Sequence, residues 1–376
     1  MKKIASLLLL FLVITSCKST RIGETDNLQV RFLDDHIIAE DLEIDGTLVG
    51  GLSGIDYHDG SYYLVVDHPG EPRLYRAEID IREERIHDID ITDVIMLDTD
   101  HPELKGMHLD MEGIVYHPIH RFFYISSEGL ISEGLDPSIF IVTENGEFRE
   151  HFKIPDNLLA ASEKEPRNNG SFEGLTRSYD GNGIWAAMEL PLAKDGPTPK
   201  LYRTQSPIRI TYFDHRTKEP QRQFTYMLEP ISKIPWLYFA INGVTDLVEY
   251  APNRFLVLER GFSAGHGRKG NTVRIFDVDA SVATNTLDKD DLKYNFHSPA
   301  QKELVYDFKW AKKFLAEGII DNIEGIAFGP ILPNGNPSLI LVADNNFNSM
   351  GRQYNQFILM EIQLNPGNQT EAAVNE

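Results

Sequence analysis

Cysteine and positive charge are scarce in this chain of 376 residues. Its single cysteine, Cys17, excludes internal disulfides and any zinc or iron–sulfur centre built from several cysteines. Lys and Arg together number 36 against 57 Asp and Glu, which gives a net charge of −21, and the basic residues form no run. Because binding to a nucleic-acid backbone requires a basic patch, we expect no nucleic-acid partner.

Sequence motifs for nucleotides and for histidine-bound metals find no support either. The 12 histidines include no H-E-x-x-H pair, and no G-x-x-x-x-G-K-[ST] loop occurs. Residues 265–270 match G-x-G-x-x-G, but this glycine-rich stretch cannot begin the helix that a dinucleotide-binding loop requires. We therefore expect no nucleotide cofactor. With 41% hydrophobic residues, 28 Gly and 20 Pro, the composition excludes a disordered or fibrous chain and predicts one large or two medium globular domains.

The longest apolar run lies at the N-terminus. Lys2 and Lys3 precede the apolar residues 4–14, and Thr15-Ser16-Cys17 follow. A charged start, a short apolar middle and small residues at the exit predict a secretory signal peptide over residues 1–16, too short to be a good membrane span. Residues 14–17 resemble the bacterial lipobox, which predicts a lipid on Cys17; an ordinary signal peptide with an incidental cysteine is the alternative.

These N-terminal features predict where the protein resides. We expect an exported lipoprotein of the bacterial cell envelope, in the periplasm or at the outer membrane, attached to the membrane through Cys17. Residues 17–27 would form a polar tether, and residues 366–376 a polar tail.

From residue 28 onward, a short motif recurs about every 60–80 residues. Stretches rich in Val, Ile, Tyr and Phe alternate with Gly, Asn, Asp and Pro, which predicts an all-β fold. Each copy of the motif is followed by a turn and an apolar strand that ends in an acid. The copies are Ser53-Gly54-Ile55, Glu112-Gly113-Ile114, Glu173-Gly174-Leu175, Thr245-Asp246-Leu247 and Glu324-Gly325-Ile326.

The repeats predict a β-propeller over residues 28–365. Four units continue into a third and a fourth strand, and the fifth lacks a fourth strand that residues 28–38 could supply. Five four-stranded blades closed by the N-terminal strand leave no exposed edge; six blades are the alternative. A pair of β-sandwiches would leave the repeat unexplained. Short helices are expected at residues 155–163 and 310–317.

The same repeats bring carboxylates together. In an antiparallel hairpin the start of the first strand lies beside the end of the second, so Glu112 should approach Glu128. Because the first strand of a blade is innermost, such pairs are expected around one mouth of the central channel. The expected carboxylates are Asp67, Glu112, Glu128, Glu173, Glu189, Asp246, Glu259, Glu324 and Asp344.

A ring of like charges requires cations, arginines or hydrogen-bond donors. Calcium is the expected ion, because it is hard and accepts 6–8 oxygens in irregular geometry. The alternative is that each Glu before a Gly accepts backbone N–H groups from the adjacent blade. The expected metal ligands are Glu112, Glu128, Glu189, Asp246, Glu324 and Asp344. The expected catalytic residues are Glu173, Arg260 and His68, and the expected ligand-binding residues are Ser53, Arg177, Glu259, Ser263 and Asn345.

Residues 261–265, GFSAG, match the hydrolase motif G-x-S-x-G. A nucleophile elbow requires a strand before the serine and a helix after it, but the glycine-rich residues 266–271 cannot begin a good helix. We therefore expect a loop at the channel mouth in which Ser263 contacts a ligand. His117, which precedes Pro118, is expected in a hairpin turn.

The motifs at the repeats resemble the phytase-like domain family described as "esterase-like activity of phytase". The resemblance lies in GLSGI at 51–55, NGSFEGL at 169–175, LERGFS at 258–263, NIEGI at 322–326 and VADNN at 342–346, and spans roughly residues 45–365. It implies a propeller, export and a role in hydrolysing phosphate or other esters. Characterised β-propeller phytases carry a string close to D-D-P-A-I-W beside their calcium sites, and this chain has none.

Two functions are compatible with these features. The first is a lipid-anchored hydrolase in which a divalent metal at the acidic mouth assists cleavage of a phosphoester or a carboxylic ester. The second is a non-catalytic propeller that binds a small ligand or a peptide at the same mouth, because propellers host many functions.

Overall fold

The computed structural model describes residues 28–348 and 351–363. The predicted signal peptide, Cys17, the tether and the C-terminal tail lie outside these residues. Within the described ranges, no helix is long and apolar enough to cross a membrane.

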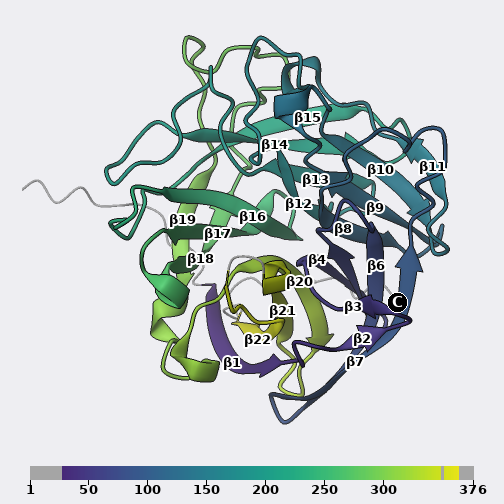
Figure 1. The fold of residues 1–376 in the computed structure, drawn as a ribbon. Helices are drawn as coiled ribbons and strands as arrows, with labels where there is room; N and C mark the ends of the chain where they lie inside the picture. Colours follow the sequence, from purple (N-terminus) through teal and green to yellow (C-terminus); the bar gives the residue numbers. More distant parts are fainter. Residues whose placement is uncertain (1–27, 349–350, 364–376) are drawn as a thin grey trace, which may run out of the picture. The chain divides into compact units, whose positions relative to one another are not determined.

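The described residues form a five-bladed β-propeller, as the repeats predict (Figure 1). Each blade is a four-stranded antiparallel sheet, and the innermost strands of neighbouring blades contact one another around a closed ring. The first blade comprises β4(Leu52–His58), β5(Ser61–Val66), β6(Arg73–Arg82) and β7(Arg85–Met96), and the second comprises β8(Met111–His117), β9(Phe122–Ser127), β10(Ser138–Thr143) and β11(Phe148–His151). The third blade comprises β12(Phe172–Arg177), β13(Gly183–Met188), β14(Pro207–Asp214) and β15(Pro220–Met227). The fourth comprises β16(Ala240–Ala251), β17(Arg254–Ser263), β18(Asn271–Asp279) and β19(Gln301–Asp307). The fifth blade comprises β20(Ile323–Ile331), β21(Pro337–Ala343), β22(Gln356–Gln363) and β1(Gln29–Ile37), and a small hairpin, β2(Glu43–Ile44) and β3(Thr47–Leu48), precedes the first blade.

The N-terminal strand closes the ring. In Figure 1 the purple β1 lies beside the yellow β22, and the two pair antiparallel from Gln29 opposite Gln363 to Ile37 opposite Gln356. The outer edge of β22 is therefore covered by a strand from the other end of the chain. Closure of this kind leaves the last blade with its full set of backbone hydrogen bonds.

The glycine of the repeated motif allows the inner strands to approach the channel axis. A Cβ atom on Gly54 would lie 2.4 Å from the carbonyl oxygen of Glu112 in the next blade, and one on Gly113 would lie 2.7 Å from that of Glu173. Any larger residue would collide with backbone at these positions. The glycines thus serve packing between blades, and apolar side chains of adjacent blades fill the space between the sheets.

Three local predictions are wrong. Residues 155–163 contain a single 3₁₀ turn, Asp156–Leu158, and residues 310–317 overlap two such turns, Phe308–Trp310 and Ala316–Gly318. Segments this short cannot offset the cost of helix nucleation, and Glu317 has a left-handed backbone at φ 53° that ends its turn. The GFSAG segment, residues 261–265, was expected to be a loop, but its first three residues belong to β17, which ends at Ser263.

Candidate functional site

Every inner strand carries a β-bulge at the repeated motif. The register between first and second strands shifts there in all five described blades. Bulges of this kind commonly re-aim a side chain next to an active site. The residues inserted at the bulges are Ser53, Glu112, Glu173, Thr245 and Glu324.

In each blade, the inserted residue of the bulge has a partner at the end of the second strand. In the second and third blades this residue is Glu128 and Glu189, whose backbone N–H groups extend the hairpin to the carbonyls of Asp110 and Ser171, over 2.9 Å and 2.8 Å. Asp67 and Asp344 occupy the same place in the first and fifth blades. In the fourth blade the register puts Arg260 there, opposite Gly243. One mouth of the channel is therefore lined by acids from the first, second, third and fifth blades and by Arg260 from the fourth.

The carboxylates at this mouth lie within reach of one another. One oxygen each from Glu112, Glu128 and Glu173 lies within 4.8 Å of the others, and the same holds for Asp67, Asp110 and Glu112. Glu128 and Glu173 are buried, while Glu112 is half-buried. We call the following eight residues the acidic ring: Asp67, Asp110, Glu112, Glu128, Glu173, Glu189, Glu324 and Asp344.

Burial and mutual repulsion raise the pKa values in the acidic ring. Burial, reinforced by the neighbouring carboxyl of Asp110, raises the pKa of Asp67 to about 10. Burial and the charges of Glu173 and Asp67 raise the pKa of Glu112 well above its usual range. Burial raises the pKa of Glu189 to about 7, with the charge of Arg260 acting in the opposite direction. Without a cation, the ring therefore holds protons near neutral pH.

Arg260 makes the ring asymmetric. Its Nη2 donates to Oε1 of Glu324 over 2.7 Å, and Nδ2 of Asn322 donates to the same oxygen over 2.9 Å. Its charge favours ionisation of Glu189 and Glu324. The carboxylates of the first two blades lie on the other side of the ring, where Glu112 and Asp67 have no such partner among the described residues. That side has the hard oxygen donors that a divalent cation prefers.

Glu259 is not part of the ring, which corrects the prediction. It pairs with Val244 in the register, so its side chain leaves the strand on the face opposite that of Arg260. Its carboxylate accepts hydrogen bonds from Tyr226 Oη, Lys302 Nζ and Asn242 Nδ2 at 2.6–2.7 Å. Glu259 thus stabilises the fourth blade from within.

Asp246, expected as a metal ligand, has a structural role instead. Its Oδ1 accepts the N–H of Leu247 and its Oδ2 accepts the N–H of Ile326, both over 2.8 Å. It occupies the place that glycine takes in the other copies of the motif, and it ties the fourth blade to the fifth. The sequence analysis gave this role, as an alternative, to each Glu before a Gly. Glu128, which precedes Gly129, also has it, because its Oε1 accepts the N–H of Ser171 at the third blade over 2.6 Å.

Arg177 and Ser263 also lie away from the acidic ring, in contrast to the prediction. Arg177 ends β12, whereas Glu173 lies at its start; its Nη2 lies 3.7 Å from Asp56 Oδ2 and donates to the carbonyl of Tyr116. Ser263 Oγ donates to the carbonyl of Lys233 over 2.9 Å. His266 Nε2 contacts the carbonyl of Ile234, so the two residues form no Ser–His pair and GFSAG is not a nucleophile elbow.

The remaining predicted residues lie around Asp67. Ser53 is the inserted residue of the first bulge, and its Oγ lies 3.5 Å from the carbonyl of Gly51. Asn345 Oδ1 accepts the N–H of Gly51 over 3.1 Å. His68 Nδ1 accepts the N–H of Glu71 over 3.0 Å, so this ring nitrogen is occupied by a local turn.

Asp110 is the acidic-ring residue that sequence reasoning missed. It precedes the bulged Glu112 by two residues, and residues two apart on a strand share a face. That spacing was the available signal. The copies of the motif resemble one another most in the residues that follow Glu112, so the repeat itself does not indicate Asp110.

Comparisons with known proteins are consistent with this architecture. Residues 47–347 match the family model "Phytase-like: Esterase-like activity of phytase". An "Uncharacterized secreted protein" of Arthroderma benhamiae is 26% identical over 214 residues, which cover 49% of this chain and 40% of that protein. This chain thus aligns with less than half of that relative's length.

Solved structures resemble the chain only distantly. An exo-β-1,3-galactanase from Phanerochaete chrysosporium has a TM-score of 0.46 at 9% identity, covering 87% of this chain and 64% of that one. An endo-1,4-β-xylanase from Bacteroides thetaiotaomicron has a TM-score of 0.41 at 12% identity, covering 88% and 90%. Likenesses at this level assign no activity to the chain.

Proposed function

Because the chain belongs to the phytase-like family, "Esterase-like activity of phytase", we propose that it hydrolyses phosphate or carboxylic esters with a divalent cation, Ca²⁺, held in the acidic ring. The observation that carries the proposal is the convergence of Glu112, Glu128 and Glu173, whose oxygens lie within 4.8 Å of one another. A single cation at that point would neutralise a cluster that otherwise retains protons.

The residues present fit a hard cation. All donors are carboxylate oxygens, and Glu189 Oε2 is buried with no hydrogen-bond partner among the described residues. Of the ligands expected from the sequence, Glu112, Glu128 and Glu189 suit this role. Glu173, Asp67 and Asp110 join them in the proposal, whereas Glu324 is engaged by Arg260.

The bound cation would polarise an ester oxygen and activate a water molecule. Arg260 would bind the substrate's anionic oxygen, because its buried Nε has no hydrogen-bond partner among the described residues while its Nη2 is held by Glu324. His68, which directly follows Asp67 in the chain, would lie beside the acidic ring.

The proposal includes the cellular location. The apolar run that ends at Cys17 and the resemblance to a protein described as secreted support export, followed by lipid attachment at Cys17. A catalytic mouth on the outer side of the cytoplasmic membrane would meet exported or environmental esters. Millimolar calcium is common outside cells, which suits a site built from carboxylates.

Turnover of chromogenic substrates tests the proposal. The purified protein would be assayed on 4-nitrophenyl phosphate, bis(4-nitrophenyl) phosphate and 4-nitrophenyl acetate, with added Ca²⁺ or with EDTA. We expect hydrolysis that EDTA abolishes and calcium restores, and that Glu173→Gln removes while the exposed Glu147→Gln does not. Calcium-induced stabilisation without turnover of any substrate would instead favour the non-catalytic binding propeller.

A further inference from the structure

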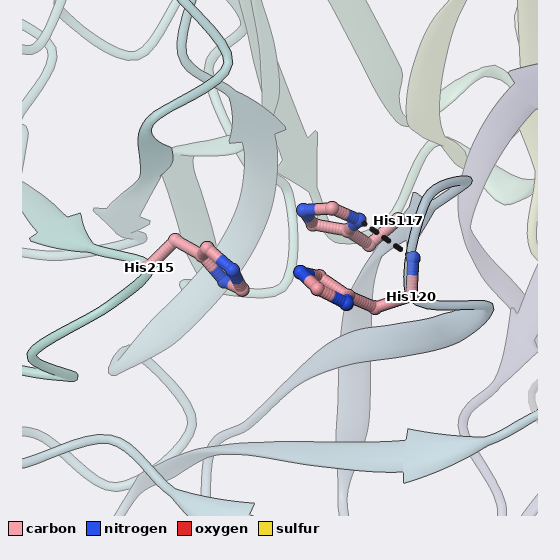
Figure 2. A group of neighbouring side chains, drawn as sticks. All are labelled: His117, His120 and His215. Atoms are coloured by element: carbon pink, nitrogen blue, oxygen red, sulfur yellow. Dashed lines mark hydrogen bonds between the residues drawn. The ribbon is translucent and has the colours of Figure 1, made fainter.

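Three histidines of two neighbouring blades face one another at the end of the propeller remote from the acidic ring (Figure 2). His117 is the last residue of β8, His120 lies in the turn between β8 and β9, and His215 follows β14. His117 was expected in a hairpin turn and lies at its entrance. The ring centroids of His117 lie 4.8 Å and 4.7 Å from those of His120 and His215, and the latter two are 5.3 Å apart.

We propose that His117, His120 and His215 bind a transition-metal ion of the Zn²⁺ class and thereby connect the second and third blades. One nitrogen from each ring lies within 4.8 Å of the other two. In Figure 2, His215 projects from one segment toward His117 and His120, which project from another. Imidazole nitrogen favours zinc, copper or nickel over calcium, so this site and the acidic ring would select different metals.

The hydrogen bonds of the three rings are compatible with metal binding. His215 Nδ1 is hydrogen-bonded to Tyr124 Oη, which leaves Nε2 available. A ligating histidine typically uses its second nitrogen in this way, and the bond orients the ring. Burial and the neighbouring imidazoles lower the pKa of His117 to about 4, and burial lowers the pKa of His215.

The geometry requires a modest adjustment. Tetrahedral zinc with Zn–N bonds of about 2.0–2.1 Å separates its nitrogen ligands by roughly 3.4 Å. The rings must therefore close by up to about 1.4 Å from the 4.8 Å limit. His120 is exposed and lies in a turn, so its ring can rotate toward the other two.

A fourth coordination position would open toward solvent. His120 and His215 line a cavity of about 870 Å³ that also includes Asp180, Asp214 and Trp185. Water from this cavity can complete the coordination, as in zinc sites with three protein ligands. The positive charge of Lys218 near His215 opposes metal binding, and the carboxylates of Asp214 and Glu150 offset it.

Zinc titration of the full protein tests the site. Calorimetry would be performed with ZnCl₂ in saturating Ca²⁺, so that calcium occupies the acidic ring. We expect one zinc ion per chain, bound at least about tenfold more weakly by His120→Ala and by His215→Gln, since loss of even an outer-shell partner has an effect of that size. The exposed His87→Ala and the acidic-ring variant Glu173→Gln should bind zinc as the unmodified protein does.

A spectroscopic measurement distinguishes the site from other zinc-binding positions. Co²⁺ in place of Zn²⁺ should produce visible absorption bands typical of tetrahedral nitrogen ligation, and both histidine variants should lose them. Circular dichroism without metal would establish that the variants are folded; His120, being exposed, is not needed for packing. Unchanged zinc affinity in the two histidine variants, or loss of zinc only in Glu173→Gln, would overturn the proposal.

Discussion

Arg260 of the fourth blade donates through Nη2 to Oε1 of Glu324 in the fifth blade over 2.7 Å, and both side chains are largely shielded from solvent. Arg260 stands where the other four blades place Asp67, Glu128, Glu189 and Asp344. One substitution in the repeat therefore introduces a permanent cation into a ring of carboxylates. This asymmetry leaves the Glu112 side of the ring to a metal ion and the Arg260 side to a substrate anion in the function that we propose.

Removing the arginine should destabilise the fold. In Arg260→Gln, Glu324 would lose its buried partner, and breaking such a pair typically costs about 3–5 kcal/mol. Urea denaturation in EDTA would measure the loss. Lys194→Gln breaks the exposed pair with Glu165 and should leave the midpoint unchanged, because exposed pairs contribute little. Equal effects of the two changes would contradict the role assigned to Arg260.

Stability without metal should fall as pH rises. Asp67 and Glu189 have folded-state pKa values of about 10 and about 7, above their ordinary values of 3.8 and 4.5. The folded state therefore binds more protons than the unfolded state. The free energy of unfolding that these protons contribute is fully present below pH 4 and is lost as pH rises through 7 toward 10. The melting temperature in EDTA should decrease from pH 5 to pH 8, and calcium should reduce the decrease. Superimposable profiles in EDTA and calcium would refute the metal site.

Glu112 and Asp246 should respond in opposite ways to neutralisation. Glu112→Gln removes a carboxyl group whose ionised form is disfavoured by burial and by its acidic neighbours, so it should raise the melting temperature of the metal-free protein and diminish the increase caused by calcium. Asp246→Asn places an amide NH₂ where a backbone N–H requires an acceptor, and it should cost about 1–3 kcal/mol with or without calcium. Thermal melts of both variants in EDTA and in calcium test the assignment; a full calcium response in Glu112→Gln would argue against it.

Closure of the ring should depend on Glu361. This buried carboxylate accepts Arg31 Nε over 2.7 Å and the amides of Asn334 and Asn336, and these bonds outweigh burial to lower its pKa to about 2. Glu361→Ala would leave these donors unpaired and should destabilise the protein by about 3 kcal/mol. Protease sensitivity within β1 should increase as well. Glu84→Ala removes the exposed partner of the same arginine and serves as the control, with stability close to that of the unmodified protein.

The fold could be predicted because the repeats constrain it. Five copies of one motif, each with a glycine or its substitute at a fixed place, require five similar environments, and a ring supplies them. Gly54 and Gly113 show why the motif keeps a glycine at this place, since a side chain there would collide with the next blade. Membership of the phytase-like family follows from the same motifs and is confirmed over residues 47–347.

The candidate site could be predicted in outline, because hairpin pairing places Glu112 near Glu128 whatever the details of the blade. The prediction is wrong for the fourth blade, where Arg260 and not Glu259 faces the channel mouth. Its bulge decides whether Glu259 or Arg260 faces the channel, and a shift of one residue reverses the two faces of a strand. Adjacent residues of opposite charge then exchange roles.

The amino-acid sequence by itself determined the propeller repeat, the closing strand and the gathering of acids at one mouth, because each depends on spacing along the chain, whereas the structure decided for five blades over six. The tertiary structure alone decided which side chains share a space. Asp246 bonds to a strand of the next blade, Arg177 braces the far end of the channel, and His215 meets His117 across a blade boundary. Such contacts depend on how blades are rotated and packed against one another, which no local pattern records.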